Sequence, residues 1–237
     1  MNHLSFIIPV YNEEENIKRL VEEINDAIKI LNMSFEIILV DDASTDNSLA
    51  VIKTISSKNS SVKYISFLKN AGQSAALYAG IQHAKGNIII TMDADLQNDP
   101  ADIPGMVKYY GKYDMITGWR YKRMDSFAKK IGSRIGNYVR NKLTGEMVHD
   151  TGCSLKIMNA EMLKKIKLYK GLHRFLPTLM KMEGAKVKEV KVGHRPRKYG
   201  VSKYSNLRRG LEGIHDDLAV RWMKKRYINV EVREKNV

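Results

Sequence analysis

Acidic side chains stand directly after three short apolar segments in the first hundred residues of the sequence. The first segment is followed by Tyr11-Asn12-Glu13, the second by Asp41-Asp42-Ala43-Ser44-Thr45-Asp46, and the third by Asp93-Ala94-Asp95-Leu96-Gln97. If these segments are parallel strands, their carboxyl ends meet at one edge of a sheet, where α/β proteins bind ligands. Several carboxylates held together repel one another unless a cation or hydrogen-bond donors offset their charge. The spacing therefore predicts a polar site that holds a divalent metal.

Asp93 and Asp95 are the sharpest candidates for metal ligands in this set. Carboxylate oxygens suit Mg²⁺ or Mn²⁺, and such a metal can hold a diphosphate at the same time. It would then act as a Lewis acid that neutralises charge on a leaving nucleoside diphosphate. Two aspartates separated by one residue also occur in solvated turns. Only together with the surrounding motifs does the pair favour metal binding.

The stretches between these acids alternate between strand-like and helix-like patterns. Apolar residues recur at helical spacing from Glu13 to Leu31, and the alanine-rich stretch Gln73–Ala84 also predicts a helix. Another helix is expected to begin within Ser44–Asp46, where acids and hydroxyls can cap free N–H groups. This alternation predicts an α/β fold, a mostly parallel sheet with helices on both faces. Strands are expected at Leu4–Val10, Phe35–Val40, Val62–Phe67, Asn87–Met92 and Asp114–Gly118, and a short helix at Ile103–Tyr110.

The pattern becomes less regular after Gly118. A basic helix is expected over Ser126–Thr144, strands over Gly152–Met158 and Val187–Val192, and a last helix over Lys203–Lys224. The last helix has an apolar stripe that can either lie on a membrane surface or pack onto the rest of the fold. The stripe consists of Tyr204, Leu207, Leu211, Ile214, Leu218 and Trp222.

Charge and composition narrow the class of protein. The 237 residues carry a formal net charge of +14, and the cations are concentrated in the second half of the chain. That asymmetry suggests an anionic partner, which can be nucleic acid, an anionic membrane surface or a phosphorylated substrate. The single cysteine, Cys153, cannot form an internal disulfide, so a reducing compartment is expected. Because no bilayer-spanning apolar run or secretion signal is recognisable, we expect a cytoplasmic location.

Six short motifs follow one another along the chain: Ile8–Glu13, Val40–Asp46, Asn70–Gln73, Met92–Pro100, Asp150–Ser154 and His194–Tyr204. In this order they resemble the inverting GT-A glycosyltransferases, specifically the group that includes dolichyl-phosphate mannose synthase and bacterial polyprenyl-phosphate sugar transferases. The resemblance covers residues 5–205, and the ordered set is far more specific than any one motif. It implies a GT-A (Rossmann-like) fold.

The resemblance also assigns roles to the acids at the strand ends. Asp95 would be the principal ligand of Mg²⁺ or Mn²⁺, Asp93 would contact the ribose or the metal, and Gln97 is a further candidate ligand. Local roles are the alternative, because a proline can end a strand and an acid can cap or adjoin the start of a helix. The residues expected to line or adjoin the nucleoside pocket, or to take such local roles, are Pro9, Tyr11, Glu13, Asp41 and Asp42.

Cations of the second half are candidates to hold the phosphates of donor and acceptor, because guanidinium groups pair bidentately with phosphate oxygens. Each can instead be a solvated surface cation. These candidates are Arg120, Arg134, Arg195, Arg197 and Lys203.

Asp150 is the candidate general base by its place in the motif. A phosphate acceptor is largely ionised at neutral pH, with a second pKa of about 6, and needs little help from a base. Asp150 can then orient an arginine instead, or simply form a turn before Gly152.

The predicted activity is transfer of a hexose-type sugar, with inversion, from a GDP- or UDP-linked donor to a polyprenyl (dolichyl or undecaprenyl) phosphate. A soluble hydroxyl acceptor, a nucleic-acid-binding protein and a catalytically silent module are the alternatives, although no nucleic-acid motif is recognisable. We expect a catalytic domain over residues 1–200, with a nucleotide-sugar half (1–118) and an acceptor half (119–200). Residues 201–237 would form a basic amphipathic tail that holds the protein peripherally on the cytoplasmic face of an anionic membrane.

Overall fold

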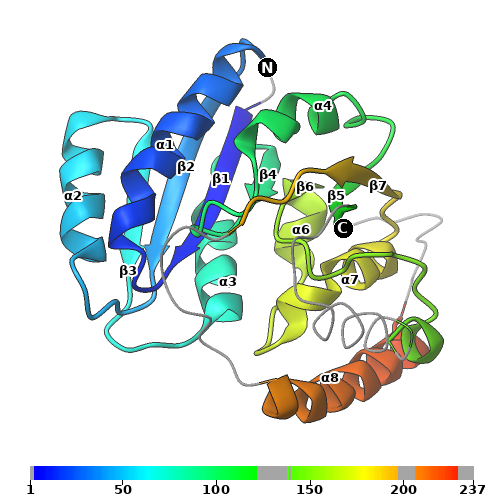
Figure 1. Cartoon of the computed structure of the whole chain (residues 1–237). Coiled ribbons are helices and arrows are strands. Elements are labelled where there is room, and N and C mark those ends of the chain that lie inside the picture. The colour runs from blue at the N-terminus through cyan, green and yellow to red at the C-terminus, as the bar shows by residue number, and fades with distance from the viewer. Residues whose placement is uncertain (1–2, 122–137, 139, 197–205, 229–237) are drawn as a thin grey trace, which may run out of the picture.

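One mixed sheet forms the centre of the molecule (Figure 1). The computed structural model describes residues 3–121, 138, 140–196 and 206–228, and within 206–212 it describes the backbone alone. The described strands follow the order β3-β2-β1-β4-β6-β5-β7 across the sheet. They are β1 (His3–Val10), β2 (Ser34–Asp41), β3 (Val62–Ser66), β4 (Ile88–Thr91), β5 (Met115–Arg120), β6 (Lys156–Asn159) and β7 (Val187–Val192).

The direction of the strands determines which chain segments meet at the functional edge of the sheet. β1 pairs in parallel with β2 and β4, β2 with β3, and β5 with β7, whereas β6 runs antiparallel to both β4 and β5. The carboxyl ends of the parallel strands therefore lie at one edge together with the amino end of β6. This arrangement confirms the mostly parallel α/β sheet, with one reversed strand that the sequence pattern did not reveal.

Helices cover both faces of this sheet, as expected. α1 (Glu14–Lys29), α2 (Ser48–Lys58) and α4 (Ile103–Val107) pack on one face, where Phe6 and Ile8 of β1 point. α3 (Gln73–His83), α6 (Ala160–Lys165) and α7 (Leu176–Met182) pack on the other face, which includes Ile7. Strands buried on both faces read as continuous apolar runs, which is why β1 and β2 were recognisable in the sequence.

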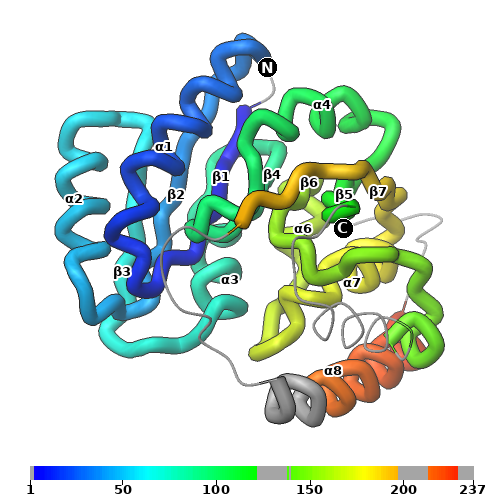
Figure 2. The backbone as a smooth tube through the Cα atoms, in the orientation of Figure 1, coloured from blue at the N-terminus to red at the C-terminus, as the bar shows by residue number. Residues whose placement is uncertain are grey.

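The last helix, α8 (Asn206–Arg226), lies on the α7 side of the molecule, apart from the sheet (Figures 1 and 2). Its Val220 is fully buried and Met223 packs against the core, so one side of α8 is joined to the domain. Ile214, Leu218 and Trp222 remain 49%, 49% and 65% exposed. About half or more of each of these three side chains of the predicted stripe is therefore open to solvent. In the described part of the chain, no helix combines the length and apolar character needed to cross a bilayer.

Some of the expected elements differ from the structure in where they begin, and two helical segments were not expected. α2 begins at Ser48 rather than within Ser44–Asp46, because Ser44 and Thr45 bond to the loop after β1 instead. β6 begins at Lys156 rather than Gly152, because the preceding residues turn toward neighbouring loops. The segments 160–165 and 172–182 were not predicted as helical, since each turn is too short for a clear period. Of the basic helix expected at Ser126–Thr144, residues 138 and 140–144 are helical, and the others lie outside the described residues.

Candidate active site

The loops after β1 and β2 are joined into one wall at the carboxyl edge of the sheet. The side-chain oxygen of Asn12 accepts a hydrogen bond from the Thr45 backbone N–H at 2.8 Å, and Asn12 adopts a positive φ of 55°. The Ser48 hydroxyl accepts from the Glu13 backbone N–H at 2.8 Å. Asp46 accepts from the Ser48 backbone N–H at 2.9 Å, which fixes the start of α2. Polar groups of the two motifs thus stabilise each other's backbone.

Tyr11 and Glu13 belong to this wall, and Pro9 lies just before it, in β1. Pro9 pairs in register with Val40 of β2, beyond the last residue of β1 that pairs with β4, so its missing N–H breaks no ladder on that side. The Glu13 carboxylate accepts a hydrogen bond from the Asn16 side chain at 2.7 Å, the local role at a helix start that the sequence left open. Their contacts with a nucleoside remain a prediction.

Asp41 and Asp42 are buried at the end of β2. Each accepts hydrogen bonds from a nearby segment of the same chain. The two carboxylate oxygens of Asp42 accept hydrogen bonds from the backbone N–H groups of Ala71 and Gly72, at 2.7 and 2.9 Å. Asp41 accepts from the Ser66 hydroxyl at 3.0 Å. Gly72 has a φ of +87°, a conformation that favours glycine. Asp42 therefore holds the Asn70–Gln73 motif against the sheet, whether or not it also lines a nucleoside pocket.

Asp42→Asn is expected to destabilise the protein by about 1–3 kcal/mol, because the amide presents a donor to one of two buried N–H groups and leaves it unsatisfied. The free energy of unfolding measured in urea checks this. Asp26→Asn, which removes an exposed ion pair with Lys29, is the matched control and should change stability by less than about 1 kcal/mol. Equal, small effects of both substitutions would show that other contacts hold the loop.

Asp93 and Asp95 follow β4 and lie beside each other. The Gln73 side chain donates to the Asp93 carboxylate at 2.7 Å, and the Ser154 hydroxyl accepts from the Asp93 backbone N–H at 3.2 Å. The Gln97 backbone N–H donates to the Asp95 carboxylate at 3.1 Å. Burial, and then the charge of Asp95, raise the pKa of Asp93 to about 6, although Ser154 and nearby cations oppose the shift. A cation placed between the carboxylates would relieve this repulsion.

The donor set fits a divalent metal whose coordination is completed by a substrate. In the described residues, no three Asp, Glu, His or Cys side chains converge as a closed metal site. Mg²⁺ characteristically uses one or two protein carboxylates together with water and substrate phosphates. Asp93 and Asp95 match that pattern. The backbone carbonyl of Gln97 accepts from the Arg195 backbone N–H at 2.9 Å, and ligation by the Gln97 side chain stays a prediction.

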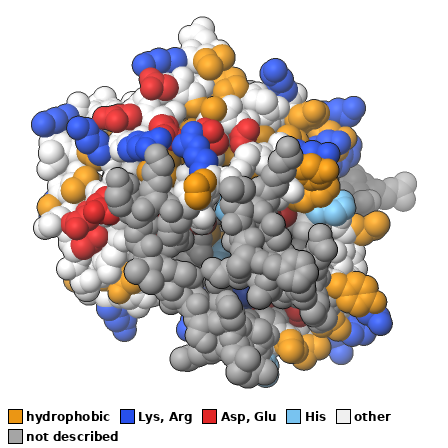
Figure 3. Space-filling view, in the orientation of Figure 1, with side chains coloured by type: hydrophobic (Ala, Val, Ile, Leu, Met, Phe, Trp, Pro, Cys, Tyr) orange, Lys and Arg blue, Asp and Glu red, His pale blue; other side chains and the backbone are white. Residues whose placement is uncertain are grey.

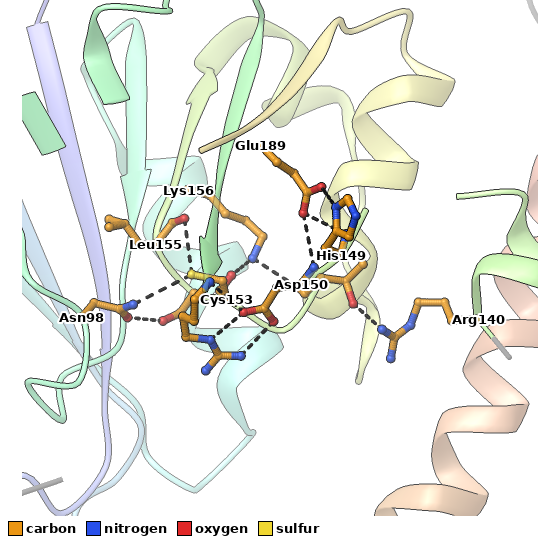
Figure 4. A network of polar contacts seen from close by, with 11 residues as sticks. Asn98, Arg140, His149, Asp150, Cys153, Leu155, Lys156 and Glu189 are labelled. Carbon is orange, nitrogen blue, oxygen red and sulfur yellow. Dashed lines mark hydrogen bonds and ion pairs between the residues drawn. The ribbon is translucent and has the colours of Figure 1, made fainter. Parts of the chain in front are cut away.

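A buried ion pair faces these carboxylates from the acceptor half. The Arg120 guanidinium donates to both oxygens of Asp150, with Nε–Oδ2 at 2.7 Å and Nη2–Oδ1 at 2.9 Å. Burial alone would lower the pKa of Arg120, but the hydrogen bonds and charge of Asp150 outweigh it and raise the pKa above its usual range. Glu189 in turn accepts from the Asp150 backbone N–H at 3.2 Å (Figure 4). This geometry matches the alternative in which Asp150 orients an arginine.

Lys156 is a buried charged residue that sequence reasoning missed. Its ammonium group donates to the backbone carbonyls of Thr151 and Cys153, so it fastens the turn that carries Asp150 (Figure 4). Burial lowers the pKa of Lys156, an effect opposed by nearby Cys153 and Asp150. The available signal was a lysine between Leu155 and Ile157 in a segment that otherwise reads as an apolar strand.

Ser154 is a second residue whose role was not anticipated. Besides accepting from the Asp93 backbone, its hydroxyl donates to the Asn98 side chain at 2.6 Å. It therefore joins the Asp150–Ser154 motif to the Met92–Pro100 motif. Two stretches more than fifty residues apart in the sequence thus share one local structure.

The cations predicted to bind phosphate differ in where they lie and in what they contact. Arg120 lies in the site, whereas Arg134, Arg197 and Lys203 lie outside the described residues. Arg195 pairs with Asp99 and Glu23, each at 2.6 Å. Because both acids bind its guanidinium, Arg195 ties the Met92–Pro100 motif to α1 rather than presenting a free fork to a phosphate.

Two curated bacterial proteins resemble this chain closely in sequence. Dodecaprenyl-phosphate galacturonate synthase of Rhizobium johnstonii is 40% identical over 223 residues, covering 92% of this chain and 66% of the relative. Undecaprenyl-phosphate 4-deoxy-4-formamido-L-arabinose transferase of Proteus mirabilis is 36% identical over 210 residues, covering 88% of this chain and 64% of the relative. The chain thus spans slightly less than two thirds of the length of these relatives.

Solved structures match the fold over nearly the whole chain. Glucosyl-3-phosphoglycerate synthase from Mycobacterium tuberculosis, in complex with Mg²⁺ and uridine diphosphate, superposes with a TM-score of 0.69. The two sequences are 14% identical, and the match covers 92% of this chain and 80% of that one. A complex of the same enzyme with Mn²⁺, uridine diphosphate and phosphoglyceric acid gives a TM-score of 0.70 at 15% identity, covering 92% and 79%. These likenesses confirm the GT-A fold.

The family model for glycosyl transferase family 2 matches residues 5–167, a range that runs from within β1 to beyond β6 and includes the Asp93–Asp95 pair and the Arg120–Asp150 ion pair. The strand-end acids that first indicated a site all lie within the residues that this family model matches. The chain belongs to glycosyl transferase family 2.

Proposed function

We propose that this protein transfers a hexose-type sugar from a nucleotide sugar to a polyprenyl phosphate. The observation that carries the proposal is the pairing, at one sheet edge, of two adjacent carboxylates with a guanidinium fixed by Asp150. The two carboxylates suit a metal-bound diphosphate, and the guanidinium suits a second phosphate. The names of both curated relatives support a polyprenyl phosphate acceptor.

The residues divide the reaction between them. Asp93 and Asp95 would hold Mg²⁺ or Mn²⁺, and the metal supplies charge neutralisation for the departing nucleoside diphosphate. Gln73 and Ser154 fix Asp93, so the carboxylate is positioned before the substrate arrives. The loops after β1 and β2, with Tyr11 among them, offer the surface for the nucleoside. The metal-bearing neighbour structures support the choice of cation.

The acceptor phosphate would attack the anomeric carbon directly and invert its configuration. Its oxygen is already ionised, so positioning and charge stabilisation supply much of the rate and no strong base is required. Arg120 would orient that phosphate while Asp150 holds the guanidinium. Asp150 acts on the reaction through Arg120 in this scheme.

A lipid-labelling assay tests the proposal. The purified protein would be incubated with Mg²⁺ or Mn²⁺, a short polyprenyl phosphate and a panel of labelled GDP- and UDP-sugars. Label extracted into the organic phase, dependent on metal and on the polyprenyl phosphate, would support the activity and identify the donor. Metal-dependent nucleotide binding without lipid label from any donor would overturn it and direct the search to hydroxyl acceptors.

Peripheral binding to an anionic membrane is part of the proposal. The outer side of α8 exposes Ile214, Leu218 and Trp222, and Arg221 and Lys225 are exposed on the same helix. Hydrophobic and basic side chains gather at the lower right of the molecule, where Figure 1 places the end of α8 (Figure 3). Apolar side chains flanked by cations suit the interface of a bilayer that contains anionic lipid.

Trp222→Ala is expected to weaken binding to vesicles of phosphatidylglycerol and phosphatidylcholine by about tenfold, because a large aromatic side chain no longer enters the interface. Co-sedimentation at two salt concentrations measures it, and added salt should weaken the wild-type protein as well. Tyr64→Ala, which removes an exposed aromatic ring on β3, is the control and should leave binding unchanged. Equal binding by the Trp222 variant would exclude this face of α8.

A further inference from the structure

Two consecutive acids on α8 each bind an arginine of the catalytic domain. Asp216 pairs with Arg174 at 2.6 Å, and Asp217 pairs with Arg140 at 3.6 Å. Asp217 is buried, although a helix on the outside of a domain has solvent available for its acids. Burying a carboxylate is costly unless a cation compensates it. The position of Asp217 therefore reflects its contact with Arg140.

Arg140 lies between α8 and the turn that carries Asp150. Its guanidinium stacks over the Phe175 ring, 5.2 Å from the centroid, which restricts where the side chain can point. Its Nη1 atom, rather than the Nε that lies nearest Asp217, donates to the Thr151 hydroxyl (Figure 4). Lys224 secures the same region, since its ammonium group donates to the Thr144 carbonyl at 2.9 Å. Arg140 is thus held by α8 and in turn holds Thr151.

Thr151 directly follows Asp150, the residue that clamps the Arg120 guanidinium. A continuous chain of polar contacts therefore runs from Asp217 through Arg140 and Thr151 to the ion pair of the site. The neighbouring pair has a different backbone contact, because Arg174 donates to the Gly171 carbonyl at 3.3 Å. Asp216 and Asp217 thus belong to one cluster of charges, in which Asp217 pairs with the arginine that donates to Thr151.

We infer that Asp217 is a positioning residue for sugar transfer: through Arg140 and Thr151, it sets the place of the Asp150 turn and hence of the Arg120 guanidinium. The inference rests on the proposed function for its kinetic consequence. A displacement of a positioned group by about 1 Å can lower a rate by about 10²-fold, so a modest shift of this turn is enough to be measured.

Asp217→Asn and Asp216→Asn are the decisive pair of variants. Asp217→Asn should lower kcat about tenfold, with the KM of the nucleotide sugar unchanged, because the donor side of the site is untouched. Asp216→Asn removes an ion pair of the same helix and should leave kcat within about twofold of the wild type. Asp217→Glu, which keeps the charge, should recover part of the lost rate. Equal losses of kcat in both asparagine variants would overturn the inference and indicate a general role of α8 in stability.

A double substitution tests the chain of contacts itself. Thr151→Val removes the hydroxyl at nearly constant shape, and it should lower kcat to a similar degree. If both residues act through the same turn, the Asp217→Asn/Thr151→Val protein should be no slower than the slower single variant. Losses that multiply would contradict a shared path.

Amide hydrogen exchange separates failure of this inference from failure of the proposed activity. Asp217→Asn should speed exchange over residues 150–155 more than Asp216→Asn does, whether or not a sugar acceptor has been found. A wild-type protein that labels no lipid would overturn the proposed function alone. Identical exchange at residues 150–155 in the two variants would overturn the positioning role.

Discussion

Replacing Asp95 by asparagine is expected to lower metal-dependent sugar transfer by roughly 10²- to 10³-fold. Such a loss is typical when one group that stabilises developing charge is removed from a preorganised site. The substitution keeps the shape of the side chain and an oxygen that can accept from the Gln97 backbone N–H. What it removes is one of the two negative charges that would hold the metal.

The same substitution should act on stability in the opposite direction. Without metal, burial and then repulsion by Asp95 raise the pKa of Asp93, and the wild-type protein holds both carboxylates close together. Asp95→Asn removes that repulsion, so its melting temperature without metal should equal or exceed that of the wild type. Thermal unfolding with and without Mn²⁺ measures this, and the stabilisation by Mn²⁺ should be smaller in the variant. Full transfer activity together with a lowered melting temperature would show that Asp95 is structural.

Arg120→Lys is expected to lower turnover by roughly 10²-fold, because an ammonium group cannot reproduce the two parallel hydrogen bonds of a guanidinium to Asp150. The acceptor phosphate would then meet a displaced cation. Stability should fall as well, since a buried carboxylate loses part of its compensation. Steady-state kinetics with varied acceptor, together with thermal unfolding, measure both effects. Arg19→Lys, at an exposed ion pair with Glu23, is the matched control and should retain full activity.

Asp150→Asn decides between the two roles of that carboxylate. If Asp150 orients Arg120, the amide oxygen still accepts one hydrogen bond, and the variant should lose less activity than Arg120→Lys. If Asp150 were the general base, the asparagine variant should be the more damaged of the two and should lose the acidic limb of its pH–rate profile. The ranking of the two variants therefore separates orientation from proton transfer.

The nucleotide half was predictable because its information is local. Buried parallel strands read as apolar runs, and the acids that follow them mark the carboxyl edge, so the positions of Asp41, Asp42, Asp93 and Asp95 followed from the sequence. What the sequence did not reveal was which groups of the protein itself these acids bind. The carboxylate of Asp42 binds Ala71 and Gly72, a contact set by the path of a loop thirty residues away.

The acceptor half was less predictable because its contacts depend on strand direction and on pairs distant in sequence. An apolar run reports burial but not orientation, so the reversal of β6 was hidden, and with it the position of Lys156 at the site edge. The charge of Arg195 made it a candidate phosphate ligand, but its guanidinium forms ion pairs with Asp99 and Glu23. Charge alone also left nucleic acid open as a partner, whereas membership of a glycosyltransferase family favours a phosphate-bearing substrate.

The order of strands across the sheet has a consequence for how the chain folds while it is being made. β1 to β4 pair only with one another and with β6, so the β3-β2-β1-β4 half-sheet is complete once Thr91 has left the ribosome. β5 ends at Arg120, but both of its neighbours, β6 and β7, are synthesised later, starting at Lys156 and Val187. Because a chain emerges from the ribosome and begins to fold from its N-terminus onward, we expect β4, which directly precedes Asp93 and Asp95, to be in place before β5 is paired. The segment that carries Arg120 would then have no strand to pair with until β6 has been synthesised.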